Sequence, residues 1–204
     1  MDPARLTETL AVIADYYDGC KVGYCGYEGY RKSTDLEKFN RCMDELVALG
    51  FIDPNKTVFL DLGCGDGRVN LLMSYFVERS IGIEIDPEIL AEYGRRSEDL
   101  SRRIQRSNLT LPPSNIFLFP GNSLEDSTYE RISESIGLKF VEIDLFYTYI
   151  TLHDLFAAKI AQEAKQGALY LVYGFSKILP QYQGLEILIP DVASQGIVAL
   201  YRKG

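Results

Sequence analysis

A glycine-rich turn directly after an apolar run is the feature that most limits what this chain can fold into. The run Val58-Phe-Leu-Asp-Leu62 is typical of a buried parallel strand. The next segment, Gly63-Cys-Gly-Asp-Gly67, has glycine at every second position. Glycines let the backbone turn sharply and approach a ligand closely. Ligands of open α/β sheets bind beyond the carboxyl ends of the strands, so this turn predicts a binding site as well as a fold class.

The segments after the turn alternate between strand and helix patterns. We expect strands at 58–62, 80–85, 115–119, 140–149, 168–173, 185–189 and 196–201. Helices are expected between the first five strands, two of them opening at the capping sequences Ser127-x-x-Glu130 and Thr151-x-x-Asp154. Only a loop separates the last two strands, which implies an antiparallel pair. The sequence therefore predicts an α/β fold with a mostly parallel sheet and a terminal hairpin.

Residues 1–50 precede this alternation and carry two helical patterns. The first has apolar residues at helical spacing from Leu6 to Tyr17, and the second opens with a capping box, Thr34-x-x-Glu37. Residues 18–30 between them are rich in glycine and tyrosine, which predicts a loop. We expect a helical region at 1–50 with a lid-like loop that brings Tyr30 to the ligand, and a binding domain at 51–204.

Charge and cysteine spacing exclude several classes of protein. The net charge of −8 disfavours binding to phosphate backbones, so nucleic acid is an unlikely partner. The four cysteines and the one histidine lack zinc-site spacing, so we expect no metal. Neither a membrane-spanning apolar stretch nor a secretory signal is evident, which predicts a cytoplasmic protein without membrane contact.

The charges of the turn discriminate between two kinds of ligand. A dinucleotide site would place a third glycine at position 68, where the chain has Arg68. Asp61 and Asp66 would repel a pyrophosphate, whereas they would attract an ammonium or sulfonium cation. Glu84, at the end of the second strand, can accept hydrogen bonds from ribose hydroxyls. The pattern therefore favours S-adenosylmethionine, and a tight turn without a ligand is the alternative.

Two stretches carry a family resemblance. Val58-Phe-Leu-Asp-Leu-Gly-Cys-Gly-Asp-Gly-Arg68 and Ile81-Gly-Ile-Glu-Ile-Asp86 resemble the first two motifs of class I S-adenosylmethionine-dependent methyltransferases, which have a Rossmann-like seven-stranded sheet. The resemblance extends over about residues 57–204. It implies that the cofactor is S-adenosylmethionine and assigns it the residues Asp61, Gly63, Gly65 and Gly67 at the methionyl part, Glu84 at the ribose and Ile85 at the adenine.

The segment after the third strand is similar to the one that contacts the adenine in that family. It comprises Asn122, as the residue that would bind the adenine amino group, together with Ser123 and Leu124. Asn122 stands where an aspartate is more common.

Methyl transfer is an in-line displacement, for which a protein mainly aligns the reactants and excludes water. The acceptor is expected at the end of the fourth strand, where Tyr147 and Tyr149 are the candidate catalytic residues and His153 is a possible base. The Asn/Asp-Pro-Pro-Tyr signature of nucleobase methylation is absent there.

The tyrosine-rich segment and the helix start at Ser33-Thr34 resemble protein-lysine methyltransferases. We therefore expect a protein lysine or a small molecule as the methyl acceptor. The alternatives are a non-catalytic methyltransferase-like domain that acts as a binding module and, third, a dehydrogenase.

Overall fold

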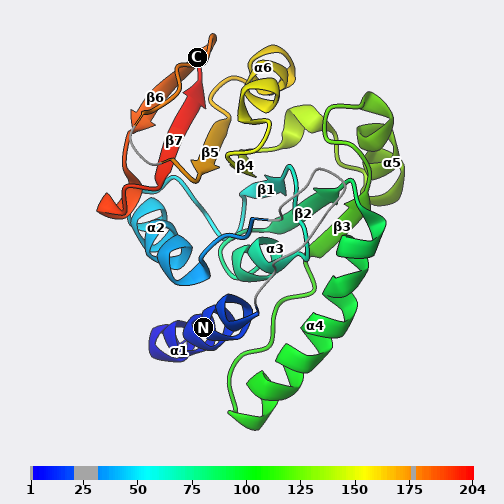
Figure 1. The fold of residues 1–204 in the computed structure, drawn as a ribbon, viewed down its shortest axis with the longest axis vertical. Coiled ribbons are helices and arrows are strands. Elements are labelled where there is room, and N and C mark those ends of the chain that lie inside the picture. Colours follow the sequence, from blue (N-terminus) through cyan, green and yellow to red (C-terminus); the bar gives the residue numbers. More distant parts are fainter. Residues whose placement is uncertain (1, 21–31, 176–177) are drawn as a thin grey trace.

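The computed structural model describes residues 2–20, 32–175 and 178–204. Its centre is a seven-stranded sheet with the order β3-β2-β1-β4-β5-β7-β6 (Figure 1). The strands are β1 (Val58–Asp61), β2 (Arg79–Glu84), β3 (Ile116–Pro120), β4 (Leu145–Tyr149), β5 (Leu169–Tyr173), β6 (Leu185–Ile189) and β7 (Val198–Lys203). The helices are α1 (Pro3–Gly19), α2 (Leu36–Ala48), α3 (Arg68–Met73), α4 (Pro87–Arg106), α5 (Asp126–Ile136) and α6 (His153–Glu163).

The pairing of the strands confirms the predicted fold class. The strands from β1 to β5 pair in parallel, whereas β7 is antiparallel to both β5 and β6. From β1 the chain adds β2 and β3 on one side and then crosses to add β4 on the other. The strand order therefore reverses between β1 and β4, where open α/β sheets bind ligands.

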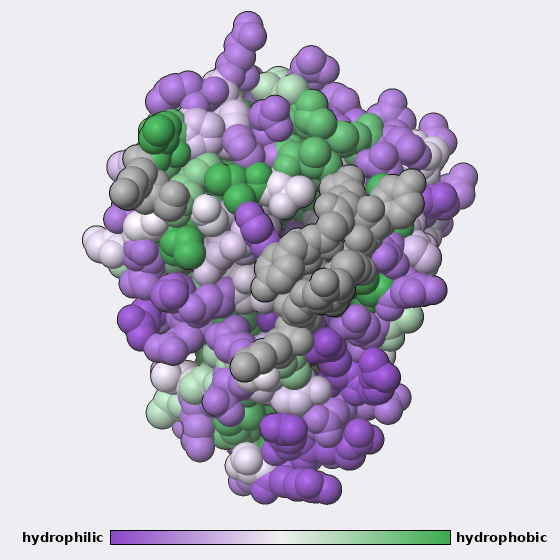
Figure 2. All heavy atoms as spheres, viewed as in Figure 1, coloured by the Kyte–Doolittle hydropathy of each residue, from purple (hydrophilic) through white to green (hydrophobic). Residues whose placement is uncertain are grey.

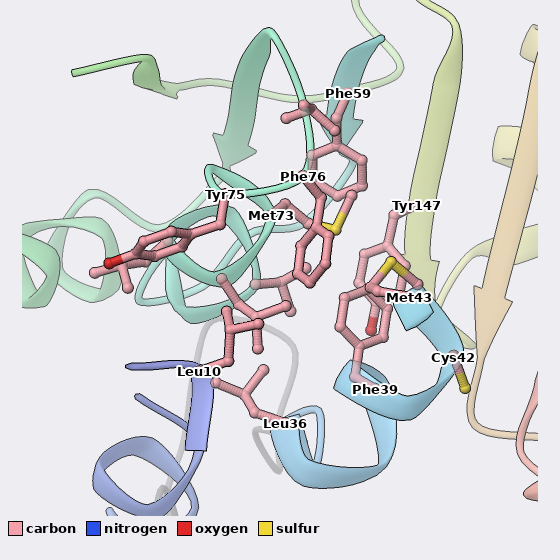
Figure 3. Packing of buried hydrophobic residues seen from close by; sticks show 14 of the residues in the cluster. Leu10, Leu36, Phe39, Cys42, Met43, Phe59, Met73, Tyr75, Phe76 and Tyr147 are labelled. Atoms are coloured by element: carbon pink, nitrogen blue, oxygen red, sulfur yellow. The ribbon is translucent and has the colours of Figure 1, made fainter. Parts of the chain in front are cut away.

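Two apolar layers cover the two faces of the sheet. Side chains of α1, α2, α3 and α4 share one buried cluster, and those of α5 and α6 share the other. Figure 3 shows Leu10 of α1 and Leu36 of α2 in the same layer, with Phe39 close to Tyr147 of β4. Both N-terminal helices therefore bury their apolar faces against the sheet domain, as an amphipathic helix must.

Three predicted helix starts are wrong. Ser127 lies inside α5, which begins at Asp126 after Glu125, and the other two fail for reasons that involve the rest of the fold. Asp35, and not Thr34, caps α2 by accepting the N–H of Lys38 at 3.0 Å. The Thr34 hydroxyl instead pairs with that of Tyr147. Helix α6 begins at His153 after Leu152, which has a left-handed backbone, so Thr151 caps nothing. In both places a tertiary contact or a tight turn takes precedence over the local capping sequence.

The fourth strand is shorter than predicted. Residues 140–142 form a 3-10 turn, η1 (Phe140–Glu142), and the strand begins at Leu145. Asp144 lies before the strand, where it accepts the N–H of Val58 at 2.7 Å and pairs with Lys165 at 2.5 Å. Among the described residues, the helices are all too short or too polar to span a membrane.

Candidate functional site

Two adjoining cavities open at the carboxyl ends of β1, β2 and β4. The larger has a volume of about 190 Å³ and the smaller about 40 Å³. Both are lined by Lys32, Gly63 and Tyr149, so they lie side by side. They lie where the strand order reverses and include the turn that the sequence indicated.

The glycines of the turn have different roles. Gly65 and Gly67 have φ angles of +57° and +72°, which L side chains rarely adopt. A Cβ on Gly67 would also lie 2.6 Å from Cδ2 of Tyr93. Gly63, by contrast, lines both cavities, and a Cβ there would meet nothing within 4 Å. Gly67 is therefore required by the backbone conformation and by its contact with Tyr93, while Gly63 borders open space in which a ligand would lie.

Asp61, at the end of β1, is a buried carboxylate at the edge of the smaller cavity. It is 2% exposed and accepts the N–H of Gly63 at 3.3 Å. In the part of the chain that the structure describes, no Lys or Arg forms an ion pair with it. Burial raises the pKa of Asp61 to about 8, and the nearby carboxylates of Glu84 and Asp66 add to the increase. A cation placed beside Asp61 would relieve this unfavourable position.

Asp66, in the same turn, is held by two arginines. Its two carboxylate oxygens accept Nε and Nη2 of Arg68, each at 2.9 Å, and Arg96 of α4 lies 3.4 Å away. Arg68 also donates to the carbonyl of Tyr17 at 3.2 Å, near the end of α1. Asp66 and its two arginines therefore connect the turn to α3, α4 and α1. Of the two carboxylates that we expected to attract a cation, only Asp61 is left without a basic partner among the described residues.

Glu84 links the end of β2 to the glycine turn. One carboxylate oxygen accepts the N–H of Gly65 at 2.8 Å and the other accepts the N–H of Asp86 at 2.9 Å. Each oxygen keeps a second lone pair, and the residue lines the larger cavity. The carboxylate can therefore hold the turn and still accept ligand hydroxyls.

The residues expected around an adenine only partly come together. Ile85, which is 48% exposed, lines the larger cavity together with Asn122 and Ser123. Ser123 donates its hydroxyl to the carbonyl of Leu62 at 2.9 Å, which ties the segment after β3 to the end of β1. Leu124 does not line the cavity and packs against the core on the α5 side.

The side chain of Asn122 is already used within its own turn. Its oxygen accepts the N–H of Leu124 at 3.0 Å, and its nitrogen donates to Glu125 at 3.2 Å. The amide oxygen has a second lone pair, so one further donor can still bind it.

The two candidate catalytic tyrosines differ in accessibility. Tyr147 is 1% exposed, its hydroxyl lies 2.6 Å from that of Thr34, and burial raises its pKa well above the usual range. Tyr149 is half-buried, lines both cavities and packs against the ring of Tyr173 at 5.3 Å. Both tyrosines line the smaller cavity; Tyr149 is the more accessible of the two, and the Tyr147 hydroxyl pairs with Thr34.

Several residues that line the cavities were not singled out from the sequence, namely Lys32, Thr148, Leu152 and Phe156. Thr148 and Leu152 lie at or near the end of the predicted fourth strand, which could have indicated them. Lys32, before the predicted helix start, and Phe156, inside α6, carried no such signal. Tyr30, the residue expected to approach the cofactor from the N-terminal segment, lies outside the described residues. His153 pairs with the hydroxyl of Tyr182 at 2.7 Å and lines neither cavity.

Similar folds are found among solved structures. The candidate methyltransferase yhhF from Escherichia coli aligns with a TM-score of 0.52 and 16% identity, over 85% of this chain and 87% of that one. The candidate methylase HI0767 from Haemophilus influenzae aligns with a TM-score of 0.50 and 16% identity, over 80% and 97%. An RNA methyltransferase from Salinibacter ruber in complex with S-adenosyl-L-homocysteine has a TM-score of 0.49 and 17% identity, over 79% and 89%.

The first two similarities show that the chain has the fold of these proteins. No protein-family model and no curated protein sequence matches the chain.

Proposed function

We propose that this protein is an S-adenosylmethionine-dependent methyltransferase. The observation that carries the proposal is the pair of adjoining cavities at the strand-order reversal, which the buried carboxylates of Asp61 and Glu84 line. Asp61 lines the smaller cavity and Glu84 the larger, and Gly63 borders open space in both. A dinucleotide would instead bring a pyrophosphate beside these carboxylates.

The residues present fit each part of S-adenosylmethionine. Asp61 would attract its positively charged methionyl end, because burial without a cation leaves this carboxylate with a raised pKa. Glu84 would accept the ribose hydroxyls through its remaining lone pairs. Ile85 offers an apolar contact for the adenine, and Asn122 has one acceptor position for its amino group.

The cofactor supplies an electrophilic methyl group when it is bound. The protein's part is to align the acceptor with that group and to keep water out. Tyr149 stands at the junction of the two cavities, and its pKa is raised by burial, so the phenol stays neutral. It can orient an acceptor nitrogen by a hydrogen bond or by contact with its ring.

We further propose a protein lysine or a small molecule as the acceptor. Leu152 and Phe156 line the larger cavity, and Leu155 beside them is 46% exposed. Figure 2 shows apolar surface gathered toward the α6 end of this face and hydrophilic surface over α4. The net charge of −8 opposes a phosphate backbone. We also propose that the protein acts in the cytoplasm.

A labelled-methyl transfer assay tests the function and the acceptor together. The protein is incubated with S-adenosylmethionine labelled in its methyl group. Three fractions of a cell lysate are added in separate reactions: proteins, RNA and small molecules. Label in the protein or small-molecule fraction supports the proposal, and label only in RNA would replace its acceptor. The matched control is Glu84→Ala, which should abolish most of the transfer to whichever fraction is labelled.

Calorimetric titration separates the enzyme from its alternatives. Binding of S-adenosylhomocysteine without transfer to any fraction would favour a non-catalytic binding module. Tighter binding of NAD than of S-adenosylhomocysteine would contradict the proposal altogether.

A further inference from the structure

Among the residues that the structure describes, few basic side chains line the two cavities. Among the described residues that line them, Asp61, Asp66 and Glu84 are acidic, and the basic ones are Lys32 and Arg68. A ligand that carries a carboxylate as well as a cation needs one basic partner in this acidic surrounding.

The charge of Arg68 is already paired with Asp66. It is 4% exposed, makes two hydrogen bonds to Asp66 and donates a third to the carbonyl of Tyr17. Moving it toward a ligand would leave the buried Asp66 with weaker partners, which is strongly unfavourable for a buried ion pair. The charge of Arg68 therefore balances Asp66, which leaves Lys32 as the basic residue whose charge is available.

Lys32 differs from Arg68 in each of these respects. It is exposed, it lines both cavities, and no carboxylate of the described residues forms an ion pair with it. Its place is fixed by anchors shortly after it. Thr34 is buried and pairs with Tyr147 at 2.6 Å, and the N–H of Asp35 donates to the hydroxyl of Tyr173 at 3.2 Å.

We propose that Lys32 binds the α-carboxylate of the amino-acid part of the cofactor and so sets the preference for ligands that carry this group. The inference rests on the proposed function. Asp61 and Lys32 would then divide the two charges of the amino acid, with the carboxylate held away from Asp61 and Glu84. Lys32 is a binding residue in this arrangement and takes no part in the chemical step.

The test compares two ligands that differ only in the carboxylate. S-adenosylhomocysteine carries it, whereas S-adenosyl-3-thiopropylamine keeps the ammonium group and lacks it. Calorimetric titration of both ligands is carried out on the wild type, Lys32→Met and Lys32→Arg. Lys56→Met is the matched control, because Lys56 is exposed and lines neither cavity.

We expect Lys32→Met to weaken the binding of S-adenosylhomocysteine about fivefold, the effect of an exposed ion pair. The same change should leave the affinity for S-adenosyl-3-thiopropylamine unchanged or increase it, since a positive charge near the ammonium group is removed. Lys32→Arg should keep the wild-type preference, and Lys56→Met should affect neither ligand.

Two results would overturn the role of Lys32 while leaving the proposed function intact. One is unchanged binding of S-adenosylhomocysteine in Lys32→Met, and the other is an equal loss for both ligands. If the wild type bound neither ligand, the proposed function itself would fail, so the two failures are distinguishable.

Discussion

Two buried carboxylates at the two ends of the glycine turn have opposite surroundings. Asp66 is held by Arg68 and by Arg96, whereas Asp61 has one backbone N–H and, among the described residues, no basic partner. A buried charge is tolerated only when it is paired or when its pKa shifts. Asp66 follows the first course and Asp61 the second, so one carboxylate stabilises the turn and the other is available to a cation.

Breaking the pair at Asp66 should have the largest effect. Arg68→Met leaves a buried carboxylate with only part of its positive surroundings, so we expect a loss of about 3–5 kcal/mol in the free energy of unfolding. Urea denaturation measures it. The double variant Asp66→Asn/Arg68→Met should recover much of the loss.

Arg102→Met is the control for that change. Its partner Asp99 lies 3.8 Å away on the exposed side of α4, so the loss should be under about 0.5 kcal/mol. Equal losses for Arg68→Met and Arg102→Met would show that the pair at Asp66 does not hold the turn.

Cofactor affinity should depend on pH through Asp61. Its pKa of about 8 in the ligand-free protein means that the carboxyl is protonated below that pH. Binding a cation requires the ionised form, so affinity should rise about tenfold per pH unit from about pH 6 to 8. Above that range the ligand's own amino group begins to lose its proton and the gain ends.

Asp61→Asn should remove this pH dependence and weaken binding at pH 8. The same variant should stabilise the ligand-free protein at pH 8. Folding raises the pKa of Asp61, so the wild-type protein loses stability as the pH rises from the pKa of this carboxyl in the unfolded chain toward about 8. An unchanged pH profile in titrations of Asp61→Asn would remove Asp61 from the site.

Glu84→Ala should weaken S-adenosylhomocysteine by at least about tenfold, because each hydrogen bond to a charged acceptor contributes about 1.5–3 kcal/mol. It also releases the N–H groups of Gly65 and Asp86. A small loss of stability is therefore expected as well, and thermal unfolding must accompany the titration. Glu88→Ala, at an exposed position of α4, should change neither quantity beyond the error.

Tyr147→Phe should have the smallest effect. It leaves the buried hydroxyl of Thr34 without its partner, which costs about 1 kcal/mol in the free energy of unfolding. Adding Thr34→Val should restore most of that loss. A fall of kcat beyond about a hundredfold in folded Tyr147→Phe would instead assign the phenol to the chemical step.

The sequence by itself determined the fold class and the place of the site. Both follow from local patterns: the alternation of strands and helices, the glycine turn after Val58–Asp61 and the carboxylate that ends the next strand. Gly65 and Gly67 are examples, because their backbones have positive φ angles, which glycine adopts more readily than any other residue. Glu84 lies at a strand end, which the apolar run before it already marks.

The tertiary structure alone decided which of these residues remain available to a ligand. Asp61 and Asp66 look alike in the sequence, but Arg96 reaches Asp66 from α4 and no described helix brings a cation to Asp61. Likewise the Thr34 hydroxyl pairs with Tyr147 instead of capping α2, and Lys32 lines the cavity two residues before that contact. Pairing between segments far apart in the chain sets the charge and exposure of a side chain, and no local pattern contains that information.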